Sequence, residues 1–225
     1  MKLEFNEVQR QFLRALLMAT AINAGFFIVR VISAHNSRYW FLFWNLMLAW
    51  LPLLFAWLLQ LSLKKHRWLS AKPLIFTVLW LGFLPNSFYL ASDLVHLHST
   101  GEVSLLYDGV MMLSFIFTGL VLGFTSLFII QRQLHDKLKR RDTHTIMAGV
   151  LLLCSFAIYL GRDFRLNSWD VLVNPAGFLF DVSDQFVNPA AHPQLLTTTL
   201  MFFALLMGIY VVLWQVIRAI QAERN

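Results

Sequence analysis

Four polar residues near the end of one apolar segment could do chemistry. Asn86, Tyr89, Asp93 and His96 follow Pro85 at short intervals, which puts all four on one side of a helix. A carboxylate and an imidazole three residues apart can exchange a proton, bind a cation or contact an anionic group. We therefore interpret Asp93 and His96 as candidate catalytic residues, and Asn86 and Tyr89 as candidate substrate contacts. The alternative interpretation is a polar stripe that faces water beyond the membrane.

Pro85 itself lies inside this segment. Proline has no N–H to donate to the Leu81 carbonyl, so it predicts a kink at this point of the helix. We expect the kink to turn Asn86 and Tyr89 towards the protein interior.

A further carboxylate, Asp108, lies at the start of the next apolar segment. A short loop separates it from Asp93, so the two carboxylates could face one another from adjacent antiparallel helices. Such a pair can hold a divalent cation or keep one proton, which makes Asp108 the third candidate catalytic residue. Alternatively, each acid ends a helix in water. The spacing of Asp93, His96 and His98 matches no known zinc pattern, and both metal content and cofactors stay open.

A dense polar run, GRDFRLNSWD, occupies positions 161–170. Its two arginines, three residues apart, offer forked donors that suit phosphate or carboxylate groups. The candidate substrate-binding residues of this run are Arg162, Arg165, Asn167, Trp169 and Asp170. The alternative is that the arginines only form salt bridges with nearby acids and that Trp169 lies at the membrane interface. We expect one shared site to contain Asp93, His96, Asp108, Arg162 and Arg165.

Long apolar segments must position these groups. The chain of 225 residues is 58% hydrophobic and 13% charged, and its mean hydropathy is +0.63, so its main solvent is lipid. The apolar runs are too long and continuous for a transmembrane β-barrel. The sequence predicts an all-α, polytopic membrane helix bundle in a single domain, residues 1–225. Six segments approach the length of a membrane span: Phe12–Ile32, Trp40–Leu63, Leu74–Ala91, Leu105–Ile130, Ile146–Leu160 and Leu195–Ile217.

Between the last two spans, residues 169–192 are apolar in places but too short to cross a bilayer, and they contain two Val-Asn-Pro-Ala turns. We expect an interfacial or re-entrant segment there. Most of the 18 Lys and Arg residues fall beside the same ends of the spans, which predicts two cytoplasmic termini. The candidate site then faces outward. The net charge of +6 follows from these topology signals, and the chain has no nucleic-acid recognition motif, so we expect no nucleic-acid partner.

Gly119 and Gly123 form a small-x-x-x-small pair that lets another helix approach closely. The neighbouring helix can belong to this chain, to a second copy in a homo-oligomer or to a partner protein. The single cysteine, Cys154, excludes an internal disulfide.

Several of these runs together resemble a known family. They are WLGFLPNSFY at 80–89, DLVHL at 93–97, Tyr107-Asp108 and GRDFRLNSWD at 161–170. The chain from about Asn45 onward is similar to a bacterial membrane-protein family catalogued only as a domain of unknown function. The resemblance implies an all-helical bacterial membrane protein, and we expect it in the bacterial cytoplasmic (inner) membrane. It implies no activity, substrate or catalytic residue.

Three hypotheses for the function remain. The favoured one is an outward-facing polar site that acts on a lipid-linked or anionic envelope substrate, because the ionisable groups gather at one face. Whether that site is enzymatic stays open, since no hydrolase, nucleotide-binding or metalloprotease motif is present. The alternatives are a non-catalytic accessory or assembly subunit and a small-molecule transporter. Membrane lipids are partners under each hypothesis.

Overall fold

The computed structural model describes residues 7–163, 177, 183 and 194–223. Six long helices make up most of this part of the chain, and each is long and apolar enough to cross a membrane. In chain order the elements are α1 (Glu7–Ala34), α2 (Trp40–Leu63), α3 (Ala71–Tyr89), the 3₁₀ helix η1 (Leu90–His96), α4 (Leu105–His135), α5 (Arg140–Asp163) and α8 (Gln194–Ala222). The prediction of an all-α bundle with six spans is confirmed.

The predicted helix limits differ from the observed ones mainly where polar residues continue a helix beyond its apolar run. Both limits of α2 agree with the prediction. The predicted fifth span, Ile146–Leu160, is shorter than the observed helix, because α5 begins at Arg140 and ends at Asp163, a total of 24 residues. Its first turn is charged, so hydropathy alone marks only the apolar part of the helix. The expected interfacial segment at 169–192 lies outside the described residues, apart from Gly177 and Ser183.

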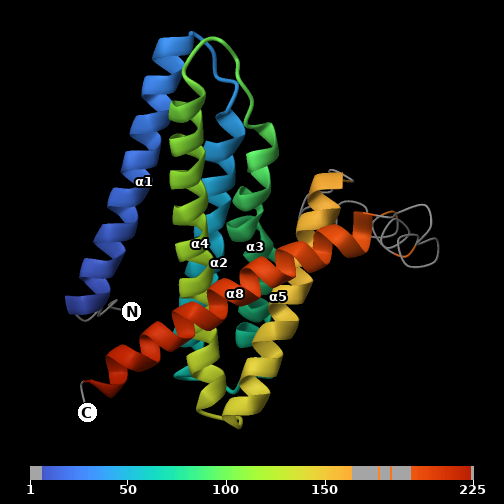
Figure 1. Cartoon of the computed structure of the whole chain (residues 1–225). Coiled ribbons are helices and arrows are strands. Elements are labelled where there is room, and N and C mark those ends of the chain that lie inside the picture. The colour runs from blue at the N-terminus through green and yellow to red at the C-terminus, as the bar shows by residue number, and fades with distance from the viewer. Residues whose placement is uncertain (1–6, 164–176, 178–182, 184–193, 224–225) are drawn as a thin grey trace.

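The helices form a bundle around α2 and α4 (Figure 1). Helix α2 packs mainly on α3 and α4, α1 lies along α4, and α8 packs on α5 while crossing the bundle obliquely. The start of α1 and the end of α8 lie at one end of the bundle, together with the 64–70 and 136–139 loops, and we call this the terminal end. The opposite end holds the 35–39 and 97–104 loops, and we call it the Arg30 end.

The glycine pair of α4 serves packing inside this chain. A Cβ atom added at Gly119 would lie 2.8 Å from the backbone oxygen of Ser87, and one added at Gly123 would lie 2.8 Å from Ser87 Cβ. The Leu90 side chain would also contact a Cβ atom at Gly119, and the Phe88 ring would contact one at Gly123. The face expected to fit another helix is therefore filled by α3 and the start of η1.

Helix α3 continues through Pro85 to Tyr89 and then tightens into η1. A 3₁₀ helix has three residues per turn, so side chains three apart lie directly above one another. This geometry determines where Asp93 and His96 point.

Candidate functional site

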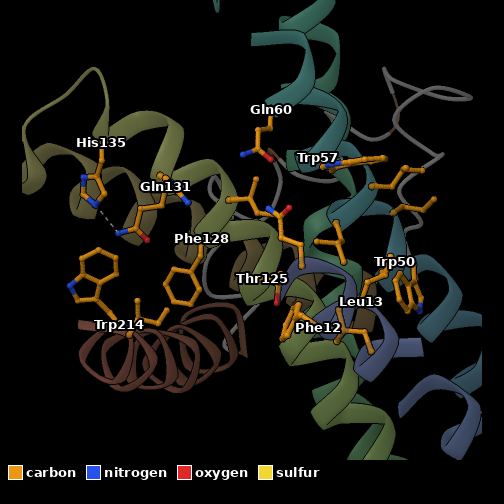
Figure 2. A pocket seen from close by; sticks show the side chains of 18 of the residues that line it. Phe12, Leu13, Trp50, Trp57, Gln60, Thr125, Phe128, Gln131, His135 and Trp214 are labelled. Atoms are coloured by element: carbon orange, nitrogen blue, oxygen red, sulfur yellow. Dashed lines mark hydrogen bonds between the residues drawn. The ribbon is translucent and has the colours of Figure 1, made fainter. Parts of the chain in front are cut away.

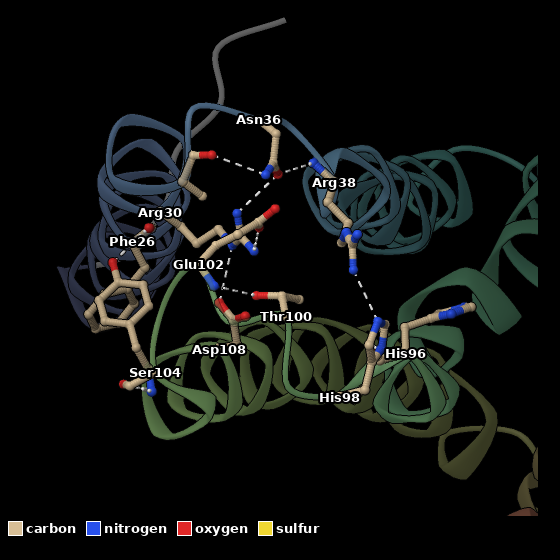
Figure 3. Close-up of polar contacts among 12 residues, drawn as sticks. Phe26, Arg30, Asn36, Arg38, His96, His98, Thr100, Glu102, Ser104 and Asp108 are labelled. Carbon is tan, nitrogen blue, oxygen red and sulfur yellow. Dashed lines mark hydrogen bonds and ion pairs between the residues drawn. The ribbon is translucent and has the colours of Figure 1, made fainter.

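A fully buried arginine joins three segments at the Arg30 end (Figure 3). On α1, the Arg30 guanidinium donates from Nε to Asp108 Oδ1 at 3.2 Å, from Nη1 to Asn36 Oδ1 at 3.0 Å and from Nη2 to Glu102 Oε2 at 3.1 Å. Every nitrogen of the guanidinium thus has a partner. Two carboxylates neutralise the buried positive charge, so this cluster has no cation left over to bind an external anion.

The start of α4 is built to place Asp108 against α1. Ser104 caps the helix by accepting a hydrogen bond from the Tyr107 backbone N–H at 3.2 Å. The Tyr107 hydroxyl donates to the Phe26 carbonyl of α1 at 2.8 Å, which ties the two helices together one turn before Arg30. Asp108 is consequently 1% exposed. The alternative in which this acid ends a helix in water is wrong.

Tyr39 closes the cluster from the loop between α1 and α2. Its ring centroid lies 5.0 Å from Arg30 Cζ, a cation–π distance, and the residue is 1% exposed. Burial, and then the negative charge of Asp108, raise the pKa of the Tyr39 hydroxyl. Neither Tyr39 Oη nor Asp108 Oδ2 makes a hydrogen bond of good geometry with another described residue.

Asp93 on η1 has a different set of neighbours. It is 3% exposed, and its Oδ2 accepts a hydrogen bond of 3.0 Å from the Asn45 amide of α2. Among the described residues it has no ion-pair partner. A buried carboxylate with only a neutral partner is costly, and such groups concentrate at functional sites.

His96 lies on the same side of η1 as Asp93 but nearer the end of the bundle. Its ring centroid is 5.1 Å from that of Phe41 on α2, one turn before Asn45, and the residue is exposed. The three-residue spacing thus directs Asp93 and His96 towards the same helix.

His98 contacts the His96 carbonyl and lies 3.0 Å from Arg38 Nη1. In the described part of the chain, no three His, Cys, Asp or Glu side chains group closely enough to hold a metal ion.

The predicted polar stripe divides at the junction of α3 and η1. Tyr89 donates from its hydroxyl to the Gly161 carbonyl of α5 at 3.3 Å, whereas Asp93 faces α2. Asn86 donates to the Phe83 carbonyl of its own helix at 3.1 Å. Both Asn86 and Tyr89 are half-buried. The change from α to 3₁₀ winding alters the angle per residue, which explains why four residues on one α-helical face separate into two groups.

The two carboxylates expected to face one another have separate partners. Asp108 pairs with Arg30 and not with Arg162, and Arg162 is exposed and makes no ion pair with another described residue. The hydrogen bond from Tyr89 to Gly161 nevertheless joins the end of α3, directly before η1, to the last turn of α5. Gly161 is the residue next to Arg162. Four other expected substrate contacts lie outside the described residues: Arg165, Asn167, Trp169 and Asp170.

Arg30, Asn36, Tyr39 and Glu102 were not among the candidates from the sequence. One signal could have found Arg30, because an arginine inside an apolar span of a membrane helix needs a buried partner. The identity of that partner depends on α1 lying along α4, which hydropathy does not report.

Comparisons with known proteins identify the family alone. No curated protein and no solved structure matches the chain. A family model described as "Protein of unknown function (DUF1361)" matches residues 44–212, which agrees with the start of the resemblance near Asn45. Since this match covers well over half of the sequence, the chain belongs to the DUF1361 family of proteins of unknown function.

Proposed function

We propose that the protein spans the bacterial inner membrane with both termini in the cytoplasm. The support is the distribution of charge, because the loops at the terminal end carry Lys64, Lys65, Arg67, Lys137 and Lys139. The Arg30 end then faces outward. A bacterial source agrees with the family resemblance of the sequence.

The function we infer is action on a lipid-linked or anionic envelope substrate at the Arg30 end. The observation that carries this proposal is Asp93, a buried carboxylate held only by the Asn45 amide. A side chain so placed can act as an acid or base, or as a cation ligand, once a substrate arrives. His96, on the same side of η1, is exposed and can contact the same substrate.

Arg162 is the proposed contact for the anionic part of the substrate. It is exposed and has no carboxylate partner among the described residues, whereas Arg30 is already neutralised. Asp108 takes a positioning role in this scheme, because it holds Arg30 and thereby the ends of α1 and α4.

The accessory-subunit alternative loses one support, since the glycine face that could have fitted a partner helix is filled internally.

The test compares envelope lipids and glycans by mass spectrometry in a deletion strain complemented with variants of this chain. Asp93→Asn should reproduce the deletion phenotype, because it keeps the shape of the side chain and removes the carboxylate. Asp136→Asn, an exposed acid at the terminal end, is the matched control and should restore the wild-type profile. A deletion strain with an unchanged envelope, or an Asp93→Asn strain that looks like wild type, would overturn the proposal.

The role of Arg162 is tested in the same strain. Arg162→Ala should impair function more than Arg38→Ala, although each removes one exposed positive charge at the same end. Equal effects would indicate general electrostatics and would remove Arg162 from the site. Immunoblots of the membrane fraction confirm that each variant is present at wild-type amounts.

A further inference from the structure

A large cavity lies towards the terminal end of the bundle, and Asp93 is not among the residues that line it (Figure 2). Its volume is about 1060 Å³, at the upper end of the range for small-molecule sites. Helices α1, α2, α4 and α8 form its walls, so it opens between membrane-spanning segments. The wall is mostly apolar and rich in aromatic side chains, namely Phe12, Trp50, Trp57, Phe128 and Trp214.

One pole of this cavity is polar. Gln131 of α4 is 1% exposed, and its Nε2 lies 3.4 Å from His135 Nε2 and 3.4 Å from His144 Nδ1. Its Oε1 has no hydrogen-bond partner among the described residues. Figure 2 shows Gln131 and His135 together on the side that faces Trp214 of α8. The cavity therefore combines an apolar body with a buried polar group that has spare hydrogen-bonding capacity.

The polar pole is also basic. Arg132 lines the large cavity, and an adjoining cavity of about 400 Å³ shares His135 and Trp214 with it and adds Arg140 and Arg218. Arg140 lies over the Trp214 ring, with Cζ 5.3 Å from the centroid. No Asp or Glu residue lines either cavity in the described part of the chain. An anionic group at this pole would therefore meet three lining arginines, while the nearby carboxylate of Asp136 lines neither cavity.

We propose that this cavity binds an anionic phospholipid from the leaflet at the terminal end. An acyl chain occupies the aromatic body between α1, α2 and α8, and the phosphate lies near Arg132, Arg140 and Arg218. Basic pockets between membrane helices suit anionic head groups, and a site that opens between the spans is reached from the bilayer itself. This site is separate from the one proposed at the Arg30 end. A negative result for either proposal therefore does not affect the other.

The experiment is native mass spectrometry of the full chain released from detergent micelles. The protein is titrated with phosphatidylglycerol or with phosphatidylcholine of identical acyl chains. Wild-type protein should retain phosphatidylglycerol in preference to phosphatidylcholine by about fivefold or more, because each nearby base contributes a factor of that order. No preference in the wild-type protein would refute the proposal.

The variants locate the head group. Arg132→Gln/Arg140→Gln/Arg218→Gln should abolish the preference. The control Lys64→Gln/Lys65→Gln/Arg67→Gln removes three charges at the same end from residues that line neither cavity, and it should keep the preference. Loss in both triple variants, or in neither, would contradict the proposed site. Should the first triple variant fail to fold by circular dichroism, Arg132→Gln against Arg67→Gln makes the same comparison.

The cavity body is tested by filling it. Thr125 lines the cavity and donates its hydroxyl to the Val121 carbonyl four residues earlier. Thr77 makes the same kind of bond to Pro73 but does not line the cavity, so it is a matched position. Thr125→Trp should reduce retention of both lipids, and Thr77→Trp should leave retention unchanged. Unchanged retention in Thr125→Trp would show that the lipid binds elsewhere.

Discussion

Arg30 Nε and Asp108 Oδ1 lie 3.2 Å apart and join α1 to α4 at the Arg30 end, across 78 positions of sequence. Arg30 is fully buried and Asp108 is 1% exposed, so neither charge is shared with water. Removing one member of such a pair leaves the other as an uncompensated buried charge, which costs more than the pair itself contributes. The integrity of the Arg30 end therefore depends on both residues.

Arg30→Met should lower the free energy of unfolding by about 3–5 kcal/mol, because Asp108 then stays buried without its cation. The free energy of unfolding is measured on the purified protein in mild detergent, with circular dichroism as the signal for unfolding. Arg38→Met is the control, since Arg38 is exposed, and its effect should stay within about 0.5 kcal/mol. Adding Asp108→Leu to Arg30→Met should recover part of the loss. Equal destabilisation by Arg30→Met and Arg38→Met would contradict the view that Arg30 and Asp108 form a buried ion pair.

Glu102 gives this cluster a pH dependence. Hydrogen bonds from Asn36 and Arg30 lower the pKa of Glu102 below its ordinary value of 4.5. A group whose pKa is lower in the folded state stabilises the protein above its unfolded pKa, and that stabilisation is lost as the pH falls through the folded value. The gap in melting temperature between wild type and Glu102→Gln should be constant at neutral pH and shrink below about 4.5. A gap that is independent of pH would mean that Glu102 is not ionised in the cluster.

The contact between α3 and α4 depends on the absence of side chains at Gly119 and Gly123. Gly119→Ala should destabilise the protein by about 1–3 kcal/mol, because the added Cβ would lie 2.8 Å from the rigid Ser87 carbonyl oxygen. Gly149→Ala is the matched control in α5, where an added Cβ meets nothing within 4 Å. That substitution should be neutral or stabilise by up to about 1 kcal/mol. Unfolding curves of the two variants in the same detergent make the comparison.

Hydropathy was enough to predict the six spans, because a bilayer demands long apolar helices whatever their neighbours are. The same rule underestimated α5, whose first turns are charged. Side-chain partners were harder to predict, since they depend on which helices are adjacent. Asp108 was recognised as a candidate, but its partner Arg30 follows from the packing of α1 on α4.

Two further features of the Arg30 and terminal ends have no counterpart in the sequence pattern. The 3₁₀ winding of η1 keeps Asp93 and His96 on one side while directing Tyr89 towards α5. A periodicity argument assumes one constant helical angle and so treats all of these residues alike. The cavity forms where four helices fail to pack closely, and the apolar residues that line its body look like ordinary lipid-facing positions in the sequence.

The orientation of the bundle in the membrane is tested by cysteine labelling of intact cells. With Cys154→Ser as background, single cysteines at Ser99 and Asp136 place one probe in the loop at each end, and both positions are exposed. A membrane-impermeant maleimide should label position 99 in intact cells and position 136 only after the membrane is opened, because the Lys and Arg residues beside position 136 favour the cytoplasm. Labelling of both positions in opened cells is the control for reactivity. Labelling of position 136 in intact cells would place the Arg30 end in the cytoplasm. The proposed substrate would then have to be a cytoplasmic one.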